Sequence, residues 1–227
     1  MTTIAARLDA VRARIAAAAR HAGRDPADVK LLAVSKTWPA EAVREAAAAG
    51  QRAFGENYVQ EGVDKVEALR ALGLEWHFIG PLQSNKTRLV ANRFAWVHSI
   101  DRLKIAERLA EQRDVHLPPL DVCIQVNVSG EASKSGVAPA DLPELARAVA
   151  SLPRLRLRGL MAIPEPTPDV ALQRARFASL RMLRDELNAA GLGLDTLSMG
   201  MSDDLEAAIA EGSTMVRVGT AIFGSRA

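Results

Sequence analysis

The feature that most constrains the fold is a repeated alternation of short apolar segments with longer amphipathic ones. Eight apolar segments have the length and composition of strands, and they span residues 31–36, 52–57, 75–80, 96–101, 121–128, 156–163, 195–201 and 215–224. About seven stretches with helical periodicity separate them, which indicates parallel β/α units. A further helix over about residues 3–21 precedes the first strand, because its apolar residues recur at helical spacing.

Eight strands allow a parallel sheet to close into a barrel that has no edge strand. The alternative is an open doubly wound sheet, which usually carries G-x-G-x-x-G after its first strand. Here that turn reads SKTWPAE. We therefore predict an α/β protein with a single (β/α)8 TIM-type barrel and an extra N-terminal helix, forming one domain over residues 1–227.

Composition excludes several classes of protein. The chain has 48% hydrophobic and 25% charged residues, as ordinary globular proteins do, and no apolar run reaches the roughly 18 residues that span a membrane. Its net charge is only +2 and its arginines are scattered, so no nucleic-acid-binding face is expected. Cys123 is the single cysteine, the four histidines are dispersed, and no signal peptide is visible. These features predict a cytoplasmic protein without disulfides or a metal site.

Lys36 is a candidate nucleophile. It follows the buried run 31–34, so it would lie at the carboxyl end of the first strand, where barrels bind their ligands. Burial there would lower the pKa of the amine, and a neutral amine can attack a carbonyl group to form a Schiff base. The alternative is a lysine that extends from the barrel end into solvent.

The last two predicted strands suggest a phosphate site. Barrels often bind phosphate with the loops after strands 7 and 8 and a nearby helix N-terminus. SMGMSDD places small and hydroxyl residues before a helix that Asp203 and Glu206 would cap, and RVGTAIFG offers Gly219 and Thr220. A reactive lysine and a phosphate site together fit either a sugar-phosphate aldolase or a protein that binds pyridoxal 5′-phosphate (PLP).

Several segments bear a specific resemblance to a known family. AVSKTWPAEAVREAAAAGQRAFGENYVQE, WHFIGPLQSNK, VNVSGEASKSGV, GLMAIP and LSMGMSDDLEAAIAEGSTMVRVGTAIFG follow one another between about residues 31 and 223. They resemble the YggS/PROSC family of PLP-binding proteins of PLP (vitamin B6) homeostasis. The resemblance implies a barrel similar to the N-terminal domain of alanine racemase, which is fold type III among PLP proteins.

The resemblance also implies roles for individual residues. Lys36 would hold PLP as a Schiff base, Asn57 would lie beside the ring, and Arg217 would face the pyridine nitrogen. The phosphate group is assigned to the ends of the last two strands, with Ser198, Gly219 and Thr220 as its contacts and Gly200 shaping the turn.

These roles imply a cofactor carrier with no robust catalysis of its own. Arginine can only donate hydrogen bonds, so Arg217 would leave the pyridine nitrogen unprotonated and the ring a weak electron sink. Racemases of this fold add a second base from a separate domain; the chain ends at Ala227, and its only tyrosine, Tyr58, is next to Asn57. We expect a monomer that binds PLP reversibly and releases it to PLP-dependent apo-enzymes. The alternative is a true PLP enzyme such as an amino-acid racemase.

Three further polar residues have two interpretations each. His77 lies mid-strand and either points toward the cofactor or is a hydrogen-bonded core residue. Lys86 and Lys134 fall in loops at the barrel mouth, where each is either a solvated side chain or a second basic group that receives or relays PLP.

Overall fold

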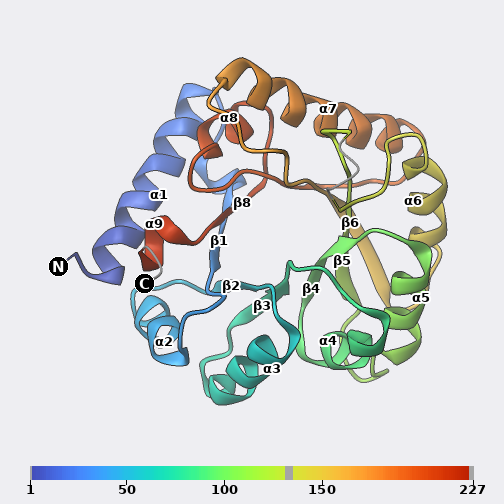
Figure 1. The fold of residues 1–227 in the computed structure, drawn as a ribbon, viewed down its shortest axis with the longest axis horizontal. Helices are drawn as coiled ribbons and strands as arrows, with labels where there is room; N and C mark the ends of the chain where they lie inside the picture. The colour runs from blue at the N-terminus through green and yellow to red at the C-terminus, as the bar shows by residue number, and fades with distance from the viewer. Residues whose placement is uncertain (1, 131–134, 225–227) are drawn as a thin grey trace.

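The computed structural model describes residues 2–130 and 135–224, in which eight parallel strands form a closed barrel in sequence order (Figure 1). The strands are β1 (Lys30–Val34), β2 (Ala53–Glu56), β3 (Glu75–Phe78), β4 (Trp96–Ile100), β5 (Leu120–Gln125), β6 (Leu155–Met161), β7 (Thr196–Ser198) and β8 (Met215–Val218). β8 pairs with β1 and so closes the ring, which confirms the predicted barrel.

The helices surround the barrel (Figure 1). They are α1 (Ile4–His21), α2 (Ala40–Ala48), α3 (Val59–Ala68), α4 (Thr87–Arg93), α5 (Leu103–Gln112), α6 (Leu142–Ala150), α7 (Val170–Ala189), α8 (Leu205–Ala210) and α9 (Thr220–Phe223), with short 3-10 turns at η1 (Pro26–Asp28), η2 (Arg70–Leu72) and η3 (Ser84–Lys86). The predicted N-terminal helix is α1, which packs against α8, α9 and α2. It therefore covers the barrel where the last β/α unit meets the first.

Two predictions at the end of the chain are wrong in detail. The strand predicted over 215–224 stops at Val218, because the amides of Ile222 and Phe223 bond to the carbonyl of Gly219 and begin α9. The residue before α8 is Asp204, one position after the predicted cap Asp203. The carboxylate of Asp204 accepts the amide of Met201 at 2.6 Å and shapes the loop after β7.

The core has two layers. The larger layer lies between sheet and helices and includes Phe54, Phe78 and Phe177. Among the described residues, two small apolar clusters are separate from this layer: one contains Leu32, Val34, Ala53, Ile79 and Met215, and the other contains Trp96, Cys123 and Met161. Buried polar side chains, among them His77, His98, Ser198 and Arg217, occupy much of the remaining interior.

The described residues contain neither a helix suited to span a membrane nor a cluster of metal ligands. None of their helices combines the length and apolar character needed to cross a membrane. No group of three or more histidine, cysteine, aspartate or glutamate side chains among them is arranged to hold a metal ion.

Candidate functional site

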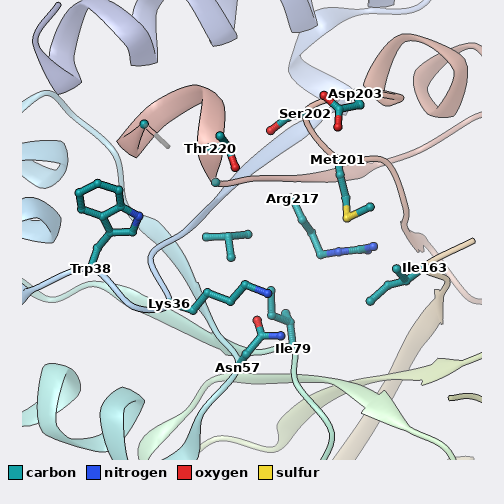
Figure 2. Close-up of a pocket in the computed structure, with 13 residues that line it drawn as sticks. Lys36, Trp38, Asn57, Ile79, Ile163, Met201, Ser202, Asp203, Arg217 and Thr220 are labelled. Atoms are coloured by element: carbon teal, nitrogen blue, oxygen red, sulfur yellow. The ribbon is translucent and has the colours of Figure 1, made fainter. Parts of the chain in front are cut away.

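A cavity of about 240 Å³ opens at the carboxyl ends of the strands (Figure 2). Its lining combines apolar side chains with a few polar groups: Val34, Lys36, Trp38, Asn57, Ile79, Ile163, Met201, Ser202, Asp203, Arg217, Gly219, Thr220 and Gly224. Lys36 and Asn57 enter from the ends of β1 and β2, and Ser202 and Thr220 lie on the opposite side of the cavity (Figure 2). Arg217 lies between these two pairs of residues. This composition is typical of a site for a small ligand with polar groups at two ends.

Lys36 lies in a tight turn over residues 35–38, which we call the lysine turn. The amide of Trp38 donates to the carbonyl of Ser35 at 3.1 Å, and Thr37 has a positive φ of 66°. The ring of Trp38 stacks on Phe223 of α9 with centroids 6.0 Å apart. The turn thus directs Lys36 into the cavity from a fixed backbone.

Asn57 supplies a polar atom that suits a ligand. Its Oδ1 is buried and has no hydrogen-bond partner among the described residues. Gly80, after β3, lies so close that a Cβ there would be 2.1 Å from the carbonyl oxygen of Asn57. Only glycine permits this approach, so Gly80 allows the backbone of Asn57 to pack directly against the segment after β3.

Arg217 is held on several sides. The residue is only 4% exposed, and its guanidinium donates to the Ser198 carbonyl (2.5 Å), to Ser198 Oγ (2.8 Å) and to the Ala162 carbonyl (2.8 Å). Burial lowers the pKa of Arg217 to about 10, which leaves it a cation at neutral pH. It therefore presents a fixed donor to the cavity.

Below the cavity, a buried polar chain runs through the barrel from Arg217 to Glu75. Ser198 Oγ contacts Nδ1 of His98 (2.8 Å), His98 Nε2 contacts Nδ1 of His77 (2.9 Å), and His77 Nε2 contacts Oε1 of Glu75 (2.5 Å). An ionised Glu75 can only accept, so with neutral rings both histidines carry their proton on Nε2 and Ser198 donates to His98. All donors then point from the cavity toward Glu75.

The pKa shifts of the residues in this buried polar chain agree with the assigned proton positions. The hydrogen bond from His77 lowers the pKa of Glu75 to about 2, so its carboxylate is ionised. Burial lowers the pKa of His77 and lowers that of His98 further below its usual value, so both rings are neutral. His77 is therefore a hydrogen-bonded core residue in this structure and does not line the cavity.

Five of the seven residues predicted to bind the cofactor line the cavity together: Lys36, Asn57, Arg217, Gly219 and Thr220. Ser198 does not, because its side chain points into the barrel and its oxygen is bound to His98 and Arg217. Gly200 is not among the lining residues either; its φ is 94°, and a Cβ there would lie 2.6 Å from that of Ala208.

Other residues line the cavity without having been predicted to do so, and of these Ser202, Asp203 and Trp38 carry polar groups or an aromatic ring. Ser202 is the second serine of SMGMSDD and follows the strand end, whereas Ser198 is still within β7. The position of each serine relative to the predicted strand end could therefore have identified Ser202 as the one that reaches the cavity. Of the two lysines with open interpretations, Lys86 is exposed at the end of η3, and Lys134 lies outside the described residues.

Comparisons with known proteins agree with this fold. The model of the alanine racemase N-terminal domain family matches residues 6–227. The pyridoxal phosphate homeostasis protein of Pseudomonas aeruginosa is 69% identical over 226 residues, covering 100% of this chain and 97% of that protein. The structure of PipY from Synechococcus elongatus with PLP bound is similar with a TM-score of 0.86 and 41% identity, covering 98% of this chain and 100% of PipY.

A more distant likeness concerns the fold alone. Alanine racemase from Corynebacterium glutamicum superimposes with a TM-score of 0.70 at 21% identity, covering 96% of this chain and 62% of the racemase. The high identity over nearly the whole length of the homeostasis protein is the stronger finding. The chain belongs to the family of pyridoxal phosphate homeostasis proteins, whose barrel is that of the alanine racemase N-terminal domain.

Proposed function

We propose that this protein binds PLP reversibly, as a Schiff base on Lys36, and supplies it to PLP-dependent apo-enzymes without robust catalysis of its own. We propose further that it does so as a cytoplasmic monomer. The observation that carries the proposal is the convergence of five side chains or backbone positions on one cavity: Lys36, Asn57, Arg217, Gly219 and Thr220.

The residues present fit PLP. The buried and unpartnered Oδ1 of Asn57 needs a polar contact that a ligand would supply. The hydroxyl groups of Ser202 and Thr220 suit phosphate oxygens, and the fixed donor of Arg217 suits the pyridine nitrogen. The solved PipY structure, 41% identical to this chain, holds PLP, which supports the same ligand here.

The proposed bond forms between the neutral amine of Lys36 and the aldehyde carbon of PLP, with loss of one water molecule. The reverse reaction with water releases the cofactor, so storage and supply need no other reactant. Bound PLP would supply an electron-withdrawing ring, and the protein groups that contact the ring would set how strongly it withdraws electrons.

The cavity is poorly suited to strong PLP catalysis. Arg217 is a cation that only donates, so it would leave the pyridine nitrogen unprotonated and weaken the ring as an electron sink. Among the described lining residues, Asp203 is the one carboxylate, and neither histidine nor tyrosine is present. Tyr58, beside Asn57, is 56% exposed and lies outside the lining.

The first experiment is a visible spectrum of the purified protein with PLP, before and after borohydride, followed by peptide mass mapping. We expect a yellow protein that bleaches on reduction and carries the pyridoxyl mass on the Lys36 peptide. Lys36→Ala should lose that adduct and bind PLP at least about tenfold more weakly, while replacement of the exposed Lys104 by alanine should leave binding as in the wild type. A protein that stays colourless with PLP, and is trapped only with a sugar phosphate, would instead be an aldolase.

The absence of robust catalysis has a separate test. We expect the PLP-loaded protein to leave the chirality and amount of each common amino acid unchanged over hours, as followed by chiral chromatography. Lys36→Ala provides the background rate. Turnover in the wild type that disappears in this variant would establish a racemase or a related enzyme.

A further inference from the structure

The lysine turn has a conformation that its own sequence disfavours. Thr37 has a φ of 66°, in the left-handed region that glycine adopts freely and that a β-branched residue avoids. It occupies the third position of a β-turn, where a positive φ usually requires glycine or asparagine. Contacts from elsewhere must therefore hold the turn.

Trp38 packs on Phe223 of α9, and the hydrogen bonds to the peptide groups beside Lys36 come from α3. Oε1 of Glu61 accepts the amide of Thr37 at 2.5 Å. Nζ of Lys65, one helical turn later, donates to the carbonyl of Ser35 at 2.7 Å and to Oε1 of Glu61 at 2.7 Å. The peptide groups on both sides of Lys36 are thus bound by two neighbouring side chains of α3.

The two side chains differ in their surroundings. Lys65 is buried, and it also bonds to the fully buried Glu56 at 2.7 Å, which in turn accepts the hydroxyl of Ser35. Glu61 is more accessible, with 28% of its side chain exposed. A substitution of Glu61 therefore leaves the ion pair between Lys65 and Glu56 in place.

The geometry points to Glu61 as a positioning residue for Lys36. By accepting the amide of Thr37, its carboxylate keeps the lysine turn in the strained conformation that directs Lys36 into the cavity. Glu61 does not line the cavity and acts only through the turn. This inference rests on the proposed binding of PLP to Lys36.

The turn itself can be tested in the protein without PLP. Amide hydrogen exchange at Thr37 should be slow in the wild type and at least about tenfold faster in Glu61→Ala, because a charge-assisted hydrogen bond is lost. Glu61→Gln retains an oxygen acceptor and should restore most of the protection. The control is Glu67→Ala, which removes an exposed glutamate of the same helix that pairs with Arg93.

The second readout is PLP binding in the four proteins, followed by absorbance titration and by the rate of borohydride trapping at Lys36. We expect Glu61→Ala to raise the Kd for PLP about tenfold and to slow attachment, whereas Glu61→Gln and Glu67→Ala stay within about twofold of wild type. Thermal unfolding of each variant shows whether the fold is retained.

The variant Thr37→Gly tests whether Glu61 acts by holding the strained backbone of the lysine turn or through its negative charge alone. Glycine adopts the left-handed conformation without penalty, so the turn should no longer depend on Glu61. In that background, Glu61→Ala should raise the Kd by less than about threefold. An equal effect in both backgrounds would show that Glu61 acts by its charge and would overturn the inference.

The outcomes distinguish this inference from the proposed function. If Glu61→Ala exchanges slowly at Thr37 and binds PLP like the wild type, Glu61 has no positioning role. If exchange accelerates but the Kd and trapping rate stay unchanged, the turn does not control Lys36 and the inference is again wrong. If the wild type itself fails to bind PLP at Lys36, the proposed function fails, whatever the exchange data show.

Discussion

Replacing Lys65 with methionine will lower the free energy of unfolding by about 3–5 kcal/mol, the range found when one partner of a buried ion pair is removed. Lys65 and Glu56 are 2.7 Å apart, and their side chains are 6% and 0% exposed. Burial already raises the pKa of Glu56, and Lys65 is a main source of the opposing stabilisation of its carboxylate. Without Lys65, the carboxylate must be buried unpaired or take up a proton.

The measurement is thermal unfolding at pH 7, where we expect the Tm to fall by roughly 10 °C. Lys104→Met removes an exposed lysine on α5 and should change stability by less than about 0.5 kcal/mol. The double variant Lys65→Met/Glu56→Gln should recover part of the loss, since no unpaired charge remains. A Tm for Lys65→Met equal to that of the Lys104 control would contradict the buried-pair interpretation.

Acidification from pH 7 to pH 5 will destabilise the protein steeply through the two histidines of the buried polar chain. Burial lowers the pKa of His77 and His98 in the folded state, whereas in the unfolded chain both titrate near the ordinary value of 6.5. Below that pH the unfolded state binds more protons than the folded state, so unfolding becomes more favourable. Each histidine can contribute at most about 1.4 kcal/mol per pH unit, and the full stability is present only above the unfolded pKa.

Glu75 titrates in a different range. Its pKa is lowered to about 2, so its contribution to stability is present above the ordinary carboxyl pKa of 4.5 and is lost as the pH falls toward 2. Between pH 5 and 7 that contribution is nearly constant. The slope of stability against pH in this range therefore reports on histidines, together with any other group that titrates there.

The check is the free energy of unfolding in urea at several pH values for the wild type, His98→Gln and His116→Gln. His98→Gln will be less stable overall, but its slope between pH 5 and 6.5 should fall to roughly half. His116 is exposed, and its replacement should leave the slope as in the wild type. Equal slopes in all three proteins would show that His98 binds protons equally in the folded and unfolded states and would contradict this prediction.

The candidate site was largely predictable because it follows from strand order. Lys36, Asn57, Gly219 and Thr220 each come just after an apolar run, and the carboxyl ends of parallel strands meet at one face of a barrel. The burial of Ser198 below the cavity was not predictable, because alternation tells which side of a strand a residue faces and not how deep in the barrel its layer lies. The end of β8 was misplaced because Ile222 and Phe223 are equally apolar in a strand or in a helix.

By itself, the sequence determined the closed barrel, its N-terminal helix and the strand end that carries Lys36, because these depend on periodicity and on the number and order of segments. Only the tertiary structure decided which polar side chains meet. Glu75 is linked to Arg217 through His77, His98 and Ser198, which lie on three strands, and Glu61 reaches Thr37 from a helix although it is 24 positions away in the chain. Such contacts depend on the stagger of the closed sheet and on how each helix packs against it, and local propensity determines neither.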